Sequence, residues 1–541
     1  MGRFCGWIIG ALVFAGAASL PRGPDAVAED ASDAAASSGA ASRPAWRPDA
    51  ELGAAARALA DAWGAIDASE SAWVGSPTAL EFLLRAARVT AGSPASPSHP
   101  APSPPPSPPP LDATLRSALH TLADSPAHDS RSPGFLLFRD RRTWDQPEPI
   151  KRLALNAQMA GVYEEAFRLT GDSRFAAVAR AALDCVLQLR TQRHVMQRAI
   201  GKPESDAEGS TAPPRIDREV STAANGLAIS VLARAGRTFG DEAYLRAAAG
   251  AADFMLREFF DDQGRLIHHW SEADFDRRAA AATTRGERHA KPAAAPAKLE
   301  DYAFFIAGLL DLFECTQRPR WLERALDLQR QLDSAHWRAT HQDIALGDAT
   351  RGDATSGRYS FEPETTPSSG SSDPSSSGEH ADAEILDGDA CATSNLVRLH
   401  ALTDDPSFHD RATQILERLA TPAFTRVTAA PRIASALDGY CRPPCRVFIV
   451  RKGPDDDIVP FLTVLTTNLE PPRVTVVTTA GVAAELLARL VPALVGKDAR
   501  LGRPTAYVVS TQRTSSEPLF TAEALAAELA KLRAGRQDVA Q

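Results

Sequence analysis

A recurring helix–turn–helix pattern constrains the fold of this chain more than any other feature. After each of four short turns, an aromatic residue lies three positions beyond the third turn residue, and an alanine lies four positions further on. The turns are 170–172, 239–241, 316–318 and 403–405, followed by Phe175 and Ala179, Tyr244 and Ala248, Trp321 and Ala325, and Phe408 and Ala412. An Asp at the end of a turn can cap the next helix, whose buried face then carries the aromatic residue and the alanine. Each unit therefore predicts a helical hairpin.

The same helical spacing of apolar residues extends through most of the first 420 residues. It predicts helices over 54–66, 78–89, 111–122, 152–169, 175–189, 223–238, 244–259, 302–315, 321–332, 391–402 and 408–419. Hairpins that repeat along a chain stack into a solenoid or close into an α/α toroid. The main body, residues 51–440, is therefore expected to be one of these two all-helical architectures.

The last hundred residues follow a different pattern. Short β-branched runs at 446–450, 473–479 and 505–510 alternate with apolar segments at 458–466, 482–490 and 521–532. Alternation of strands and helices predicts a small parallel α/β subdomain over 441–531. No glycine-rich turn follows its first strand, so a nucleotide site is not indicated.

Several segments are too polar or too rich in proline to join a compact core. They are 22–50, the inserts near 92–110, 200–215, 274–298 and 344–384, and the tail 532–541. Such compositions bury too little apolar surface to offset the entropy of ordering. We expect these segments to be disordered.

The first 21 residues have the order of a secretory signal peptide: Arg3, an uncharged apolar run over 4–20, and small residues before Pro21. This order predicts export to the periplasm or the medium. An uncleaved anchor is the alternative, because 17 apolar residues reach the lower limit of a membrane span. Membrane contact is expected only in that case.

Composition excludes several functions. A net charge of −9 without a basic run argues against a nucleic-acid partner. The six cysteines include no Cys-x-x-Cys pair, and the histidines lack ligand spacing, so neither a metal site nor a thioredoxin-type redox pair is expected. The usual nucleotide and phosphate motifs are also absent from the sequence, and we expect no cofactor.

An ordered set of short motifs carries a resemblance to a known family. The motifs are LNAQ at 155–158, YEEA at 163–166, NGL at 225–227, EDYAF at 300–304, GLLDL at 308–312, NLVRL at 395–399 and GRPTAY at 502–507. Together they resemble the spermatogenesis-associated protein 20 family over residues 75–530. The resemblance implies an (α/α)6 toroid like those of N-acylglucosamine 2-epimerases and six-hairpin glycosidases, with a carbohydrate-type cleft at its mouth.

The sequence also departs from the family pattern. We expect no counterpart of that family's thioredoxin-like domain among these residues, because no Cys-x-x-Cys pair is present. The segment corresponding to its His-Phe-Glu-Lys reads EPIK at 148–151, and Ala224 replaces a tryptophan before Asn225. Retained motifs are mainly structural, whereas polar positions of the cleft have changed, which favours weak or absent catalysis.

Carboxylates at expected helix starts are the catalytic candidates. Glu300 and Asp301 begin a helix, where acids cap free backbone amides; alternatively they act as general acid and base at the toroid mouth. Catalysis of that kind needs a second carboxylate across the cleft. The candidate partners are Asp217, Asp387 and Asp389, and the last two are also candidates for binding the substrate.

Other polar residues are candidates for substrate binding. Asn225, Lys151 and Gln158 could each bind a sugar hydroxyl or satisfy a neighbouring backbone, and Tyr302 belongs to the same motif as Glu300. The aromatic run at 268–270 could stack on a sugar, although packing at the base of a hairpin is the favoured interpretation.

Cys441 and Cys445 flank the junction between the helical body and the α/β part. In an exported protein they are expected to form a disulfide, with a reduced pair as the alternative. The sequence thus predicts an exported toroid that handles a carbohydrate ligand with little or no catalysis, or a non-catalytic interaction scaffold.

Overall fold

The computed structural model describes most of the chain that was expected to fold. The described residues are 77–90, 113–129, 131–137, 147–201, 216–285, 295–341, 355–359, 387–419, 431–511 and 514–540. The expected signal peptide, Cys5 and the predicted helix at 54–66 lie outside them. None of the helices in these ranges is long and apolar enough to cross a membrane.

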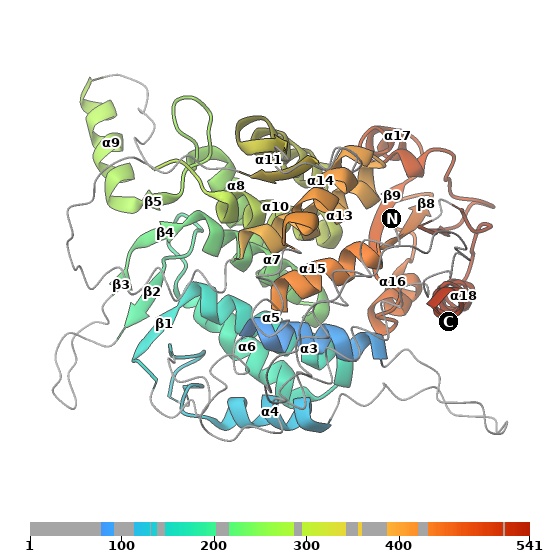
Figure 1. The fold of residues 1–541 in the computed structure, drawn as a ribbon, viewed down its shortest axis with the longest axis horizontal. Helices are drawn as coiled ribbons and strands as arrows, with labels where there is room; N and C mark the ends of the chain where they lie inside the picture. Colours follow the sequence, from blue (N-terminus) through green and yellow to red (C-terminus); the bar gives the residue numbers. More distant parts are fainter. Residues whose placement is uncertain are drawn as a thin grey trace, which may run out of the picture.

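Within the described ranges, six helices form a closed ring (Figure 1). They are α3 (Pro77–Thr90), α5 (Leu153–Thr170), α7 (Thr222–Phe239), α10 (Leu299–Thr316), α13 (Gly388–Thr403) and α15 (Pro431–Cys441). Each contacts the next in this order, and α15 contacts α3. The repeat is therefore a toroid rather than an open solenoid.

A second set of helices lies outside the ring. They are α4 (Ala113–Asp124), α6 (Ser173–Gln188), α8 (Glu242–Glu258), α11 (Pro319–His336) and α14 (Pro406–Leu419). The last four each pack on the inner helix that precedes them in the chain. The expected mainly α toroid of helical hairpins is confirmed.

The turns between inner and outer helices explain the sequence repeat. Asp172, Asp241 and Asp405 each accept a hydrogen bond from the backbone amide two residues ahead, and so cap α6, α8 and α14. The middle residue of every turn has a positive φ. All four aromatic residues and all four alanines of the repeat are buried. The local interpretation of the repeat is therefore confirmed.

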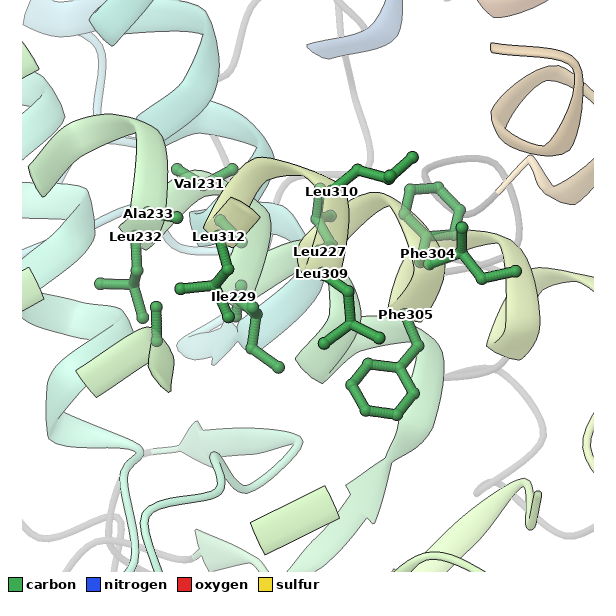
Figure 2. Packing of buried hydrophobic residues seen from close by; sticks show 14 of the residues in the cluster. Leu227, Ile229, Val231, Leu232, Ala233, Phe304, Phe305, Leu309, Leu310 and Leu312 are labelled. Carbon is green, nitrogen blue, oxygen red and sulfur yellow. The ribbon is translucent and has the colours of Figure 1, made fainter. Parts of the chain in front are cut away.

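The centre of the core is the crossing of α7 and α10. Both helices are buried around almost their whole circumference, as expected for central helices (Figure 2). A Cβ added to Gly226 would lie 2.5 Å from the carbonyl carbon of Phe304, and one added to Gly308 would lie 2.8 Å from the oxygen of Gly226. The two backbones approach this closely because both residues lack side chains.

Short strands lie in the connections that lead from an outer helix to the next inner helix. They are β1 (Ile150–Arg152), β2 (Ala199–Gly201), β3 (Ile216–Asp217), β4 (Glu219–Ser221), β5 (His269–Ser271), β6 (Trp337–His341) and β7 (Thr355–Tyr359). These connections lead into the N-terminal ends of the inner helices, and we call this end of the ring the mouth.

The C-terminal part forms a three-stranded sheet in the order β10 (Thr505–Val509), β8 (Cys445–Arg451), β9 (Arg473–Thr479). The predicted parallel pairing is correct for β8 and β9, but β10 runs antiparallel to β8. The sheet is therefore mixed. Val447 and Ile449 of β8 face a small separate core, whereas Phe448 and Val450 join the main core. Alternation along one strand thus packs the sheet against the ring on one face.

Helices α16 (Val459–Thr467) and α18 (Ala522–Ala540) contribute Phe461, Leu465, Leu525 and Leu529 to the small core on the other face of the sheet. Between β9 and β10 lie α17 (Val482–Ala488) and the short 3-10 helix Pro492–Leu494. The α/β subdomain is thus a sheet with helices on one side and the toroid on the other.

The structure differs from expectation in segments predicted to be disordered. Helix α9 (Glu272–Arg285) covers part of the insert 274–298, β7 lies inside the insert 344–384, and α18 continues into the tail. The sequence of helix α9 is mostly polar, and most of its described side chains are exposed to solvent. Composition alone therefore excluded these residues from the core but not from regular structure.

Candidate functional site

The candidate residues gather at the mouth of the ring. Glu300 and Asp301 lie in the first turn of α10, and Asp387 and Asp389 lie at the start of α13. Asn225 and Gln158 belong to the N-terminal halves of α7 and α5, and Lys151 lies in β1, just before α5. Asp217 is in β3, at the edge of the molecule and away from α13 (Figure 1).

Asp301 is fully buried, and its carboxylate accepts three hydrogen bonds from the protein. The donors are the backbone amide of Lys298 at 2.8 Å, the backbone amide of Ala223 at 3.0 Å, and Nδ1 of His268 at 2.6 Å. The first bond closes a capping box on α10, and the second satisfies an amide in the first turn of α7. This geometry is that of a helix cap that joins two inner helices, rather than of a group that meets a ligand.

His268 is the group that Asp301 orients. Because Asp301 accepts a hydrogen bond from Nδ1, the neutral imidazole carries its lone pair on Nε2. The ring is half-buried and lies against that of His269, with 3.7 Å between the ring centroids and an angle of 46° between the planes. Burial and the neighbouring His268 lower the pKa of His269 to about 3. Of the two imidazoles, His268 is the one that is hydrogen-bonded to Asp301.

Trp270, the third member of this run, is buried against Phe254 and Phe259. The interpretation of Trp270 as hairpin packing is confirmed.

Glu300 and Asp387 bring two carboxyl groups to neighbouring helix starts. A Cβ on Gly388 would lie 2.9 Å from the backbone nitrogen of Glu300, so the N-terminus of α13 abuts that of α10. Burial raises the pKa of Glu300, and the nearby Asp301 raises it further. Burial also raises the pKa of Asp387, although a hydrogen bond from Ala390 and the charge of Arg432 oppose the shift. Carboxyls with raised pKa values suit acid–base work near neutral pH.

A polar cluster connects three inner helices beside these carboxyls. Nε2 of Gln158 in α5 donates to Glu81 of α3 at 2.5 Å, and Arg432 of α15 donates to the Gln158 oxygen. Arg432 also pairs with Glu81 at 3.5 Å, and its guanidinium lies 5.4 Å from the ring centroid of Phe304. A guanidinium group, a side-chain amide and an aromatic ring thus lie together at the mouth.

The remaining candidates serve the backbone. Oδ1 of Asn225 accepts from the amide of Met196 and its Nδ2 donates to the carbonyl of the same residue, both at 2.8 Å. Nζ of Lys151 pairs with Asp129 at 2.8 Å and donates to two loop carbonyls. Both side chains therefore bond backbone groups of neighbouring segments, which was the alternative to binding a sugar hydroxyl.

Tyr302 is buried, which raises its pKa to about 12. Asp217 binds Nε of Arg198 at 2.7 Å, and this pair joins β3 to the segment before β2. Cys441 ends α15 and Cys445 begins β8; both are thiols in this structure, and their disulfide stays a prediction for an oxidising compartment.

The sequence reasoning missed three residues of this site. Arg432 and Glu81 carry no motif, and His268 was assessed only as part of an aromatic run. Each becomes significant through a partner far away in the chain, such as Asp301 for His268. The bias of acidic residues toward helix starts was the one signal that pointed to the mouth.

Comparisons with known proteins agree with the sequence motifs. No family model matches the chain. It is 27% identical to spermatogenesis-associated protein 20 of Rattus norvegicus over 301 residues, which is 56% of this chain and 34% of the relative. The human protein is 27% identical over 225 residues, 41% of this chain and 25% of the relative. The chain thus matches only a quarter to a third of the length of these curated relatives.

Solved structures with a similar arrangement share little sequence. A GH76 α-mannanase of Bacteroides thetaiotaomicron has a TM-score of 0.46 and 10% identity, covering 73% of this chain and 96% of its own. A D-mannose isomerase has a TM-score of 0.47 and 13% identity, covering 74% and 99%. The sequence matches confirm that this chain resembles the spermatogenesis-associated protein 20 family.

Proposed function

We propose that the mouth of the ring binds a sugar and that Glu300, Asp387 and His268 are its acid–base groups. The observation that carries this proposal is the arrangement at the start of α10: the Glu300 carboxyl, whose pKa is raised, lies near the imidazole that Asp301 orients, and the Asp387 carboxyl, whose pKa is also raised, lies at the neighbouring start of α13. Sugars present many hydroxyls, which the polar groups at this mouth can bond.

The three groups have separable roles. A protonated Glu300 or Asp387 can donate to a glycosidic or carbonyl oxygen, and Nε2 of His268 can accept a proton from carbon or water. Arg432, held by Gln158 and Glu81, can orient hydroxyls through its remaining donors. Asp301 acts through His268 and is a positioning residue.

Sugar binding is tested by the melting temperature and by calorimetry of the purified chain with a panel of mono- and oligosaccharides. We expect Glu300→Gln to weaken binding about tenfold, since a hydrogen bond to a charged or ionisable group is worth 1.5–3 kcal/mol. The matched control is Glu242→Gln, an exposed acid on the outer helix α8. A native protein that responds to no sugar would contradict the proposal.

Turnover is tested separately. Proton NMR in D2O would report exchange at the carbon next to a carbonyl, and release of a chromogenic aryl group would report glycoside cleavage. His268→Gln should abolish whichever reaction occurs while the protein still binds sugar.

A non-catalytic scaffold is the second candidate. The polar atoms of Lys151, Asn225 and Asp301 are already bonded to the protein, which leaves fewer groups for a substrate. Binding without turnover, unchanged in His268→Gln, would support this alternative.

We also propose that the protein is exported, on the basis of its apolar N-terminal run. To test this, the protein is expressed with residues 1–21 in place, and its cellular location and intact mass are measured. Intracellular accumulation with an unprocessed N-terminus would contradict it.

A further inference from the structure

The C-terminal α/β subdomain carries most of the large apolar side chains that the structure leaves in solvent. Among the described residues seven such side chains are exposed, and six of them belong to this subdomain. The six are Val459, Leu462, Val482, Leu486, Val495 and Leu501. The seventh, Ile216, lies in β3. Single exposed apolar residues are ordinary, but a concentration of them on one part of a protein marks an interaction surface.

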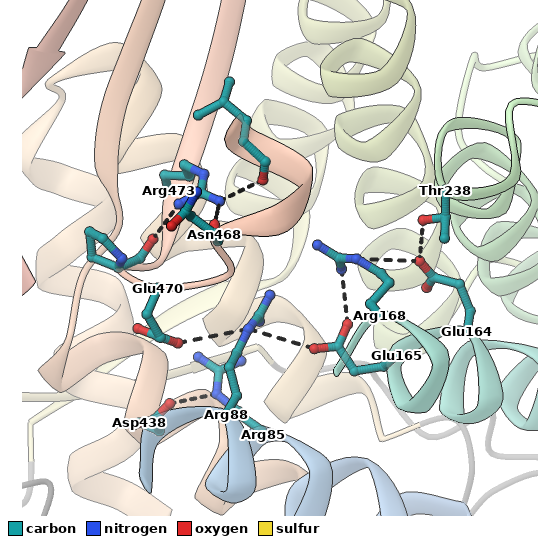
Figure 3. Close-up of polar contacts among 12 residues, drawn as sticks. Arg85, Arg88, Glu164, Glu165, Arg168, Thr238, Asp438, Asn468, Glu470 and Arg473 are labelled. Carbon is teal, nitrogen blue, oxygen red and sulfur yellow. Dashed lines mark hydrogen bonds and ion pairs between the residues drawn. The ribbon is translucent and has the colours of Figure 1, made fainter. Parts of the chain in front are cut away.

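One end of the three-stranded sheet is fixed to the ring. Near the start of β8, Arg446 donates to both oxygens of Asp404, the residue after α13, at 2.7 and 3.0 Å. Glu470, just before β9, lies 3.7 Å from Arg88 of α3, which also lies 3.6 Å from Glu165 of α5 (Figure 3). Because β8 and β9 are parallel, their carboxyl-terminal ends lie together at the opposite end of the sheet.

The carboxyl-terminal end of β8 and β9, which we call the free edge, carries exposed apolar residues of α17. The amide of Ala480, after β9, donates to the carbonyl of Arg451, the last residue of β8, at 2.8 Å. Val482 follows two residues later, and Leu486 lies one helical turn beyond it on the same face of α17. Their side chains are 70% and 51% exposed.

Two further segments meet at the free edge. A Cβ on Gly502, in the loop that leads into β10, would lie 3.9 Å from Nζ of Lys452, in the turn that follows β8. Leu501, next to Gly502, is 79% exposed, and Val459, which begins α16 just after the same turn, is 65% exposed. Loop, turn and helix starts therefore form one apolar end of the subdomain.

The turn and the loop carry opposite charges. Residues 452–457 include three aspartates and one lysine, whereas residues 497–503 include two arginines, one lysine and one aspartate. Asp455 and Arg500 are both exposed, and within the described part of the chain the side chain of neither forms an ion pair or a hydrogen bond. Their charges are therefore available to a partner.

This combination of charges is complementary to itself. A twofold axis that passes between the turn and the loop places each of them against the oppositely charged segment of a second copy. An anionic lipid surface or a nucleic acid would instead meet the three aspartates with like charge. The distribution of charge therefore favours a second copy of this chain as the partner.

We propose that the free edge is the interface of a symmetric homodimer. Val482, Leu486 and Leu501 of the two copies pack together, and the acidic turn of each copy faces the basic loop of the other. The interface lies outside the mouth of the ring and does not depend on the proposed sugar binding.

The test is the mass of the full purified chain in solution. Sedimentation is measured at pH 7 over a protein concentration of about 1–100 µM, the range in which a standard interface of modest affinity assembles. We expect the mass to double across this range. A monomer at every concentration, or an assembly larger than a closed dimer, overturns the proposal.

An apolar substitution locates the interface. Leu486→Glu should weaken self-association about tenfold or more, because it places a charge among the packed side chains. Ile216→Glu is the matched control, since it makes the same kind of change at an exposed apolar residue of β3 and should leave the dimer intact. Equal association of Leu486→Glu and Ile216→Glu overturns the assignment.

Charge reversal tests the twofold arrangement. Asp455→Arg and Arg500→Asp should each weaken self-association about tenfold, because each puts like charges against one another at two places in the dimer. An equimolar mixture of the two variants should form a heterodimer, in which opposite charges face each other again. Melting temperatures of the separate variants check that both are folded. A mixture that associates no better than either variant alone overturns the arrangement.

Discussion

The side-chain amide of Gln317 pairs with the backbone of Val477, and this contact joins the helical ring to the C-terminal sheet. Its Oε1 accepts from the Val477 amide at 2.6 Å, while Nε2 donates to the carbonyl of Thr475 at 3.2 Å. Gln317 occupies the turn after α10 with a φ of 57°. Two equivalent turns use Gly171 and Gly240, whose missing Cβ atoms would meet no neighbour. A left-handed glutamine is strained, and its contact with the edge strand β9 offsets that strain.

Gln317→Ala should therefore lower the free energy of unfolding by about 1–3 kcal/mol. The variant keeps the strained φ and leaves the Val477 amide without its acceptor. Chemical denaturation checks this. Gln317→Gly relieves the strain but loses the same bonds, so it should destabilise the protein less than Gln317→Ala does. If the alanine variant were as stable as the native protein, Gln317 would not hold the ring to the C-terminal sheet.

Gly226→Ala should destabilise the ring by about 1–3 kcal/mol or more. The added methyl meets the backbone of Phe304, which cannot move aside as a flexible side chain could. Thermal and urea unfolding measure the effect. Gly171→Asn is the matched control, because its turn is open and asparagine tolerates a left-handed φ; a comparable loss there would argue against the tight crossing.

Asp301→Asn should lower stability and also change the behaviour of His268. Removing the charge weakens three hydrogen bonds at the starts of α7 and α10, at a cost of about 3–5 kcal/mol for a buried charged partner. The readout specific to orientation is the tautomer of His268, which the NMR shifts of its two ring nitrogens report, because Asp301 bonds Nδ1. Unchanged ring-nitrogen shifts in the variant would contradict the positioning role.

Lowering the pH should destabilise the protein by protonating Glu165, which lies in the half of α5 away from the mouth. Its folded pKa, about 2, lies below the unfolded value near 4.5, so its contribution is present above about pH 4.5 and is lost as the pH falls toward 2. The shift corresponds to about 3 kcal/mol. Denaturant melts between pH 7 and pH 2.5 measure this loss, which should be smaller in Glu165→Gln. The same slope in that variant would place the titrating group elsewhere.

The turns of the repeat were predictable because their signals are local. Asp172 caps the helix that begins beside it, and Phe175 and Ala179 reach the core on the face set by helical spacing. Strands β8 and β9 were likewise visible as β-branched runs. The direction of β10 was not, because pairing depends on where the chain returns to the sheet rather than on the composition of the strand.

The candidate site was predictable only in part. Acidic residues at helix starts indicated Glu300 and Asp387, since the helix dipole favours them wherever the helix lies.

The sequence by itself determined the hairpin unit and the end of the ring that carries the carboxyl groups, because caps, turns and helical spacing act over a few residues. Closure through the contact of α15 with α3, the pairing of His268 with Asp301, and the arginines around Glu165 were decided by the tertiary structure. Each of these joins residues that are distant in the chain. Their separation and burial depend on how all six inner helices pack, which no local pattern encodes.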